Sequence, residues 1–200
     1  MGGVTLRDGE LVVERPPNEL DELAIAFSRT LSRLDIGHAF VAGYLAILTG
    51  RARATDDIDV LVETLSTTEV DELVAVLESE DYWGPAMPLE EMHGNLDAGT
   101  NIWVAPEDQM TPHLEVKFPV DEFDHASLDH AIDAHVGDAT IPVGPLELQI
   151  AYKLHLGAQK DFEDATHLYV LFRESLRTTH LETWVEKLEV TEEYERLQSI

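Results

Sequence analysis

The sequence predicts a mixed α/β fold in which a small mixed sheet is flanked by helices and followed by a C-terminal helical part. Across residues 1–144, apolar runs with a two-residue period, typical of strands, alternate with helical patterns. Glycine and proline turn signals separate these runs. After Gly144 the apolar residues recur at helical spacing alone, so we expect an α/β catalytic part over 1–144 and a helical part over 145–200.

The first half of the chain predicts a hairpin followed by alternating helices and strands. Asp8-Gly9 is a turn signal within residues 4–13, which we expect to form the hairpin. Asn18 precedes a helix that runs to about Leu34. An Asn side chain at this position accepts a hydrogen bond from a free backbone N–H of the first turn. The elements expected next are a strand over 38–42, a short helix over 44–49, a strand that begins at Asp57, and an amphipathic helix over 68–79.

The second half predicts more strands before the terminal helices. Residues 82–99 contain two prolines and several glycines, so we expect an irregular flap there. We expect residues 101–104 and 114–118 to form two further strands of the sheet, and in the second the apolar Leu114, Val116 and Phe118 alternate with polar side chains. A second hairpin is expected near His135 and Ile141.

Asp57 and Asp59 are the most informative residues of the chain. Side chains two apart on a strand project to the same face, so both carboxylates would lie side by side. Mg²⁺ favours such hard oxygen ligands and usually sits between one or two carboxylates and the phosphates of a substrate. Gly43 stands one short helix earlier, where a glycine lets backbone N–H groups approach a phosphate. The pattern indicates a phosphate-and-metal site, whereas an Asp-x-Asp alone is also typical of an ordinary polar strand end.

A third carboxylate should come from a neighbouring strand whose side chain points the same way. Glu115 is the candidate, because residues 112–118 alternate apolar with polar side chains. Lys117 lies on the same face and either contacts phosphate or only solvates the strand. The alternative for both residues is a solvent-facing strand edge.

Residues 42–59 resemble the signature of the DNA-polymerase-β-like nucleotidyltransferase superfamily, which is a Gly-Gly or Gly-Ser turn, a short helix, and Arg-x-Thr-x-Asp-x-Asp on the next strand. Stand-alone prokaryotic members, including the abortive-infection toxin nucleotidyltransferases, are the most similar. Two turn positions depart from the pattern, since Ala42 replaces the first glycine and Tyr44 stands where some members carry serine or glycine. Glu115 stands where the family more often has Asp.

The resemblance implies a Mg²⁺-dependent nucleotidyltransferase with two ions and a nucleoside triphosphate as substrate. It implies a catalytic, metal-binding triad of Asp57, Asp59 and Glu115. The residues it implies for nucleotide binding are Gly43, Tyr44, Arg53, Thr55, Lys153, Asp161 and Asp164.

The residues of the helical part also allow ordinary structural roles. Lys153 either reaches the triphosphate as a point charge or extends its ammonium from an apolar helix face to water. Asp161 and Asp164 lie three apart and share a helix face, where they build the wall of the site or belong to a solvated helix start.

Two other functional hypotheses stay open. Asp57 followed by Glu115 and Lys117 is the skeleton of a metal-dependent nuclease, although that pattern has no role for Gly43 or Arg53. Alternatively, the chain is a catalytically degenerate binding module of a toxin–antitoxin pair, a hypothesis that Ala42, Leu45 and Glu115 keep open.

The charge of the chain is extreme, with a net charge of −27 and a pI of about 4.4. Acidic residues alternate with apolar ones along every segment, which indicates a folded protein with a carboxylate-covered surface. Self-repulsion at this charge weakens compaction in dilute buffer, and salt screens it. We therefore expect a halophilic, cytoplasmic protein from a salt-loving prokaryote such as a haloarchaeon.

The same composition bounds the partners. No lysine- or arginine-rich patch that would hold a nucleic-acid backbone is visible. No apolar run approaches the roughly 20 residues of a membrane span, so we expect no membrane contact. The acceptor is left open among tRNA, protein and a small molecule, and a cognate antitoxin or toxin is a further possible partner.

Salt dependence tests the interpretation of the acidic surface. We expect the melting temperature to rise from dilute buffer to molar KCl, because molar salt shortens the Debye length to roughly 3 Å and screens the repulsion among surface carboxylates. Thermal unfolding followed by circular dichroism at both salt concentrations measures this. An unchanged melting temperature contradicts salt adaptation.

Overall fold

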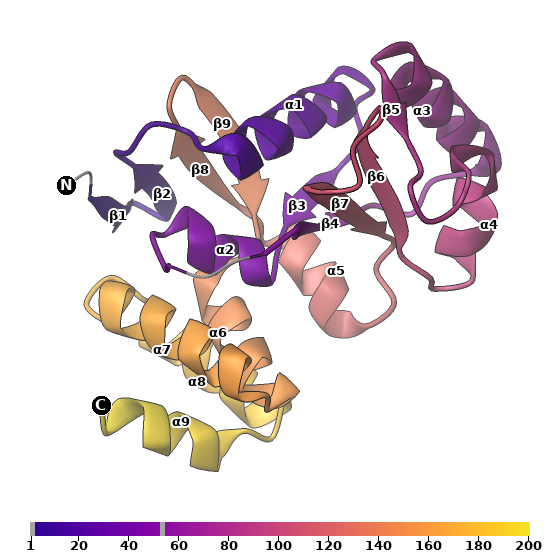
Figure 1. Ribbon diagram of the computed structural model, residues 1–200. Coiled ribbons are helices and arrows are strands. Elements are labelled where there is room, and N and C mark those ends of the chain that lie inside the picture. The colour runs from indigo at the N-terminus through magenta and orange to yellow at the C-terminus, as the bar shows by residue number, and fades with distance from the viewer. Residues whose placement is uncertain (1–2, 53–54) are drawn as a thin grey trace.

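The computed structural model describes residues 3–52 and 55–200, and within them nine strands form one mixed sheet in the order β1-β2-β8-β9-β3-β4-β7-β6-β5 (Figure 1). Helices flank this sheet, and α6 to α9 form a layer of their own beneath it in the view of Figure 1. The mixed α/β fold expected from the sequence is thus confirmed. The sheet is larger than expected because the hairpins β1–β2 and β8–β9 both extend it on the β3 side.

The expected elements occur in the expected order, and α5 is an additional helix that the sequence analysis did not predict. The strands are β1 Val4–Arg7, β2 Glu10–Val13, β3 His38–Phe40, β4 Asp57–Val62, β5 Tyr82–Trp83, β6 Ile102–Pro106, β7 His113–Lys117, β8 Ile132–Val136 and β9 Ala139–Val143. The helices are α1 Glu19–Arg33, α2 Gly43–Leu48, α3 Thr67–Ser79, η1 Leu89–Glu91 (a 3₁₀ turn), α4 Met92–Asp97, α5 Glu122–Asp129, α6 Leu146–Leu156, α7 Gln159–Phe172, α8 Thr178–Lys187 and α9 Thr191–Gln198. Both predicted hairpins and the Asn18 cap of α1 are confirmed.

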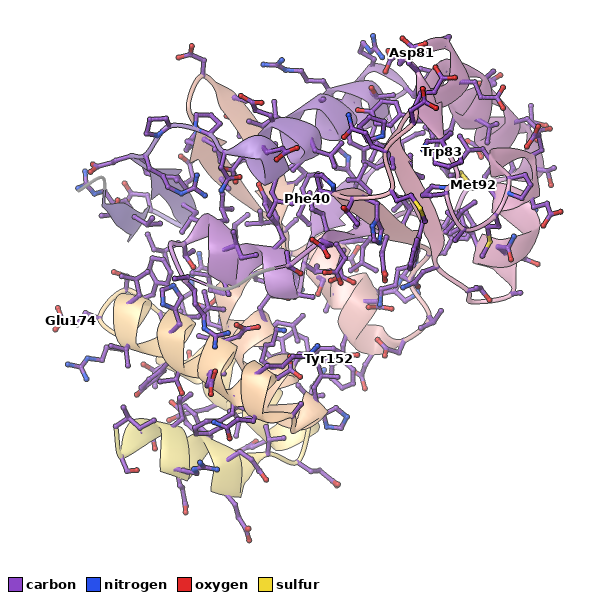
Figure 2. The ribbon with its side chains drawn as sticks, in the orientation of Figure 1. Phe40, Asp81, Trp83, Met92, Tyr152 and Glu174 are labelled. Atoms are coloured by element: carbon purple, nitrogen blue, oxygen red, sulfur yellow. The ribbon has the colours of Figure 1, made fainter. Side chains whose placement is uncertain are left out.

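Strand β4 lies inside the sheet, antiparallel to β3 and parallel to β7. Its residues Ile58, Val60 and Val62 are fully buried, as the alternation of the sequence predicts. Burying an aliphatic side chain of this size stabilises the fold by about 1.5–3 kcal/mol, so these residues strongly favour one orientation of β4. Phe40 of the adjacent β3 lies near the centre of the molecule (Figure 2).

The segment 82–99 is not the irregular flap that its prolines and glycines predict. It contains β5, the turn η1 and the helix α4, and the segment packs against α3. The physical reason is that Leu89, Met92 and Leu96 carry enough apolar surface to join the core, where they are at most 3% exposed. These three side chains attach the segment to the fold although local turn signals dominate its sequence.

The four C-terminal helices are organised around α6. Helix α6 packs against α5 on one side and against α7, α8 and α9 on the others. Its apolar residues Leu148, Ile150 and Leu154 are buried, which explains why this helix is apolar around most of its circumference. No helix in the described ranges is long and apolar enough to cross a membrane.

A buried carboxylate fixes α2 against α1. Asp21, which has no exposed surface, completes the capping box of α1 by accepting a hydrogen bond from the Asn18 N–H at 2.8 Å. The same carboxylate pairs with the Arg15 guanidinium and accepts a hydrogen bond from the Tyr44 hydroxyl at 3.0 Å. Because Tyr44 belongs to α2, this contact positions the short helix and the turn that precedes it.

We expect Asp21→Ala to lower the free energy of unfolding by about 3 kcal/mol, because it removes one partner of a buried ion pair and leaves the Tyr44 hydroxyl without its acceptor. Tyr44→Phe, which removes a single hydrogen bond, should cost only about 1 kcal/mol. Urea unfolding at high salt compares the two variants. Equal losses for both would contradict a central role for the Asp21 carboxylate.

Candidate functional site

A cavity of about 400 Å³ lies between the sheet and α6, and the predicted acidic pair, Asp57 and Asp59, lines it. Its volume falls within the range of small-molecule sites in proteins. The sheet and the turn before α2 supply Val41, Ala42, Gly43, Thr55, Asp57, Asp59, Leu61 and Lys117. Helices α5, α6 and α7 supply Phe123, Asp124, Ser127, Leu148, Gln149, Tyr152, Lys153, Leu156, Lys160 and Asp161.

The register of β4 and β7 places three carboxylates on one face of the sheet. Asp59 pairs with Glu115 and Asp57 pairs with His113, and partners in a parallel pair direct their side chains to the same side. Glu115 does not line the cavity, and its Oε2 accepts a hydrogen bond from the Asn101 amide at 3.1 Å. Among the described residues, no three His, Asp or Glu side chains are grouped so that they could hold an ion by themselves. The predicted triad therefore shares a face but is not a preformed three-carboxylate metal site.

The surroundings of Asp59 disfavour the ionised form of its carboxyl group. Burial, followed by the neighbouring charges of Asp57 and Glu115, raises the pKa of Asp59 from 3.8 to about 6, and Lys117 and Lys153 oppose this rise. A bound divalent cation would favour the ionised form and relieve this repulsion. The oxygen donors of the cavity therefore fit a hard cation such as Mg²⁺.

The turn before α2 is strained at the position where the sequence departs from the family pattern. Ala42 has φ 58° and ψ −127°, a conformation that glycine adopts readily and alanine does not. Two hydrogen bonds hold the turn in place, one from the Val41 N–H to the Asp59 carbonyl at 3.0 Å and one from the Ala42 N–H to Gln149 Oε1 at 2.9 Å. The turn is thus fixed directly beside the acidic strand, and Gly43 follows it as the first residue of α2.

Tyr44 does not reach the cavity with its side chain. Its ring is fully buried and packs edge-on against Phe40 with the centroids 5.8 Å apart. Burial, with the nearby negative charge of Asp21, raises the pKa of Tyr44 well above its usual value. The Tyr44 side chain therefore has a structural role, because the short helix turns it toward α1, and a role in nucleotide binding is left to the Tyr44 backbone N–H alone.

A buried ion-pair network forms the helical wall of the cavity. Lys153 is only 5% exposed, and its Nζ lies 2.7 Å from Asp161 Oδ1 and 3.1 Å from Asp164 Oδ2. Arg51, which follows α2, also pairs with Asp164 and lies 2.6 Å from Glu163. Both aspartates are buried, so the alternative of a solvated helix start is wrong, as is that of a lysine extended to water.

The structure separates the remaining predicted residues. Asp161 lines the cavity, whereas Asp164 lies behind it as part of the ion-pair network. Thr55 lines the cavity and its hydroxyl donates a hydrogen bond to the Asp57 carboxylate. Lys117 lines the cavity too, and its Nζ lies 3.0 Å from the buried Asp124. The predicted residue at position 53 is outside the described residues.

Several lining residues escaped the sequence prediction because they come from helices distant in the chain. Gln149 of α6 bonds to the turn and also donates from Nε2 to the Ser127 hydroxyl at 3.2 Å. Phe123 of α5 and Tyr152 of α6 pack with their ring centroids 6.2 Å apart, and Tyr152 lies where these two helices meet (Figure 2). The sequence feature that could have indicated this group is Gln149, a polar residue on an otherwise apolar helix face.

Comparison with known proteins supports the fold. No protein-family model matches the sequence, and no match to a curated protein is significant. An antigenic nucleotidyltransferase-like protein from Paracoccidioides brasiliensis matches with a TM-score of 0.57 and 16% identity, covering 85% of this chain and 87% of that one. The antibiotic-resistance factor ANT(2'')-Ia matches with a TM-score of 0.51 and 12% identity, covering 91% and 97% respectively. The chain thus has a nucleotidyltransferase-like fold, and these neighbours do not support the abortive-infection toxin subtype in particular.

The raised pKa of Asp59 predicts a pH-dependent stability. Between about pH 4 and pH 6 the folded state binds more protons at this carboxyl than the unfolded state does, so its contribution to stability is lost as pH rises through this window. Asp59→Asn cannot ionise and should therefore gain stability over the native chain as pH rises from about 4 to about 6, with a constant gain above.

Thermal unfolding without divalent cations, repeated across that pH range, measures the difference. Asp56→Asn is the matched control, because Asp56 is an exposed neighbour of the acidic pair, and its effect should not follow this pH course. A stability difference for Asp59→Asn that does not change with pH would contradict the assigned pKa.

Proposed function

We propose that the chain is a Mg²⁺-dependent nucleotidyltransferase that moves a nucleoside monophosphate from a nucleoside triphosphate to an acceptor. One observation carries the proposal: Asp57 and Asp59 line one wall of a cavity whose helical wall contains Lys153. The Ala42–Gly43 turn lies between them and is bonded to the acidic strand. Carboxylates for a cation and a lysine for phosphate are the parts that nucleotidyl transfer needs.

In this proposal Asp57 and Asp59 hold the metal, and Glu115 joins them as the third carboxylate after leaving Asn101. When bound, Mg²⁺ would neutralise the negative charge on the attacking and leaving oxygens. The Thr55 hydroxyl orients the Asp57 carboxylate through their hydrogen bond. The N–H groups at the start of α2, beginning with Gly43, face the phosphates, since the first turn of a helix leaves these donors without helical partners.

The helical wall positions the rest of the nucleotide. Lys153 and the exposed Lys160 supply positive charge toward the triphosphate, as compact ammonium groups do. The aromatic rings of Phe123 and Tyr152 provide an apolar surface for the base. Gln149 acts as a positioning residue, because it holds the strained turn against α6 and α5.

The proposed transfer forms one bond and breaks one bond at the α-phosphorus of the nucleotide. The acceptor hydroxyl oxygen forms a bond to the α-phosphorus, and the bond from that phosphorus to the oxygen bridging to the β-phosphorus breaks, releasing pyrophosphate. The hydroxyl proton passes to the Glu115 carboxylate. Lys153 faces the side on which negative charge develops on the leaving pyrophosphate.

The proposed setting is a cytoplasm of high salt, and the acceptor is a tRNA, a protein or a small molecule. The acidic surface disfavours a long nucleic-acid acceptor because it repels phosphate backbones. A more specific part of this proposal is a role of the chain in a toxin–antitoxin pair. Incubation with labelled nucleotides in a high-salt cell extract would identify the fraction that becomes labelled.

The nuclease hypothesis fits the cavity less well. It needs Lys117 beside the reacting phosphate, and this lysine is paired with Asp124 as Lys153 is paired with Asp161, so ion pairing does not separate the two hypotheses. The nuclease hypothesis, however, leaves the Ala42–Gly43 turn and Lys153 without a role. The third hypothesis is a module that binds nucleotide without transferring it. The transfer assay with the aspartate variants distinguishes it from both enzyme hypotheses.

We expect Asp57→Asn and Asp59→Asn each to lower the transfer of α-³²P label to acceptor by about 1,000-fold or more, because about 4 kcal/mol of transition-state charge stabilisation is lost. The wild-type protein is first incubated with Mg²⁺ and each nucleoside triphosphate in turn, and release of pyrophosphate is followed alongside.

Asp56→Asn again serves as the matched control and should retain activity, since the exposed Asp56 side chain does not line the cavity. Retained transfer in either active-site variant would remove that aspartate from the mechanism. Mg²⁺-dependent nucleotide binding without transfer would favour the degenerate module, and shortened nucleic acid without added nucleotide would favour the nuclease.

A further inference from the structure

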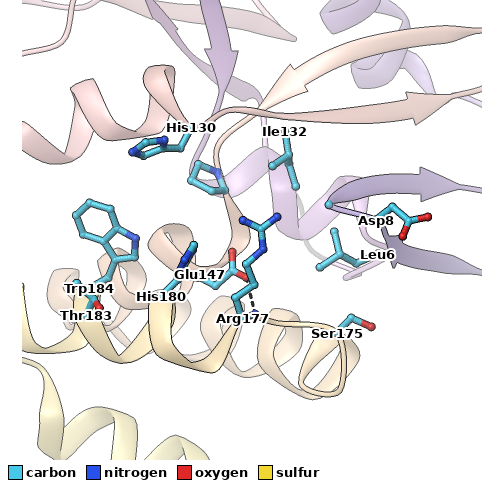
Figure 3. Close-up of a pocket in the computed structure, with 12 residues that line it drawn as sticks. Leu6, Asp8, His130, Ile132, Glu147, Ser175, Arg177, His180, Thr183 and Trp184 are labelled. Atoms are coloured by element: carbon cyan, nitrogen blue, oxygen red, sulfur yellow. Dashed lines mark hydrogen bonds between the residues drawn. The ribbon is translucent and has the colours of Figure 1, made fainter.

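A second cavity of about 330 Å³ lies beside the start of α6, apart from the acidic cavity (Figure 3). The β1–β2 hairpin, the α5–β8 connection, the start of α6 and helix α8 with the loop before it all contribute to its walls. Most of the exposed lining is apolar, and a few polar groups converge on it, which is the usual composition of a small-molecule site.

Arg177 is held at the centre of this cavity. Its backbone N–H donates to Glu147 Oε1 at 2.8 Å, which fixes the start of α8 against α6. Its side chain extends from there toward the strands, between Glu147 and Leu6 (Figure 3). The far end of the guanidinium touches the hairpin turn, because a Cβ at Gly9 would lie only 3.2 Å from Arg177 Nη2. The guanidinium therefore lies against the turn, and Arg177 as a whole is exposed.

The Arg177 guanidinium has no carboxylate partner. Like the exposed Arg7, Arg29 and Arg173, it forms no ion pair within residues 3–52 and 55–200, but unlike them it lines a cavity. Of the two carboxylates that border the cavity, that of Glu147 already accepts the Arg177 N–H, and that of Asp8 points away from the guanidinium (Figure 3). The five donors of this planar group are thus available to a ligand.

Trp184 supplies a fixed aromatic wall opposite the hairpin. Its ring packs edge-on against Phe123 with the centroids 6.2 Å apart, and Lys187 Nζ lies 4.8 Å from its centroid. Ile132 lies between Trp184 and the hairpin (Figure 3), and Pro145 adds further apolar surface to the lining. A wall held by such contacts loses little freedom when it binds a ligand.

We propose that this second cavity binds a small organic anion with a planar apolar body. The anionic head, a carboxylate or a phosphate, forms two parallel hydrogen bonds with the Arg177 guanidinium. The planar body lies against Trp184, Pro145 and Ile132, and the Thr183 hydroxyl and the His130 ring border it. The proposal does not depend on nucleotidyl transfer, because the Arg177 cavity shares no lining residue with the acidic one.

Binding of 2-naphthoate, 2-naphthyl phosphate and the neutral 2-naphthamide to the full chain, measured by calorimetry, tests the site. At least one of the two anions should bind at least about tenfold more tightly than the amide, a difference of about 1.4 kcal/mol, and the tighter one identifies the preferred head group. Arg177→Gln should weaken binding of that anion at least about tenfold and abolish the preference over the amide. Trp184→Leu should weaken binding of all three probes.

Arg173→Gln is the matched control, since it removes the same charge from an exposed arginine outside the cavity. It should leave binding within about twofold of wild type. Thermal unfolding of each variant verifies the fold, and Arg177→Lys keeps the charge but loses the planar fork, so it should restore binding only in part. Equal binding of anions and amide, no binding of any probe, or equal effects of the two arginine-to-glutamine substitutions would overturn the proposal.

Discussion

The parallel pairing of β4 with β7 is the constraint on which the candidate site depends. In this register Asp59 stands beside Glu115, and a slip of one residue would turn one of the two carboxylates to the opposite face. A slip of β4 by one residue would also drive both Asp57 and Asp59 into the core in place of Ile58 and Val60, which are fully buried. The hydrophobic effect on one face of the strand therefore determines the position of the charges on the other face.

A network of paired charges lies across the cavity from the acidic strand. Lys153 is buried and paired with two aspartates of α7, and Arg51 links the same network to the end of α2. Removing a single partner from a buried network is costly, which makes the arrangement of α2, α6 and α7 specific even though replacing the whole network by apolar residues need not reduce stability. The same network keeps a lysine near the acidic strand in a chain that has few lysines.

Helix α6 borders both cavities with different residues. Gln149, Tyr152 and Lys153 face the acidic cavity, and Glu147 near the start of the helix borders the one that contains Arg177. The aromatic rings of Tyr152, Phe123 and Trp184 are in contact from the first cavity to the second. A single apolar helix thus separates two sites of unlike charge, because its few polar residues point in different directions.

The sequence by itself determined the order of the elements, the capped start of α1, and the shared face of Asp57 and Asp59, because these depend on side chains close together in the chain. It also singled out Ala42 as a departure, and the positive φ of that residue agrees with the glycine expected there. Only the tertiary structure decided that Gln149 holds the turn 107 residues away, that Tyr44 faces the core, and that Asp164 is buried behind Lys153. The physical reason is that local patterns set the direction of a side chain relative to its own element, whereas its partners are set by packing between elements that are distant in sequence.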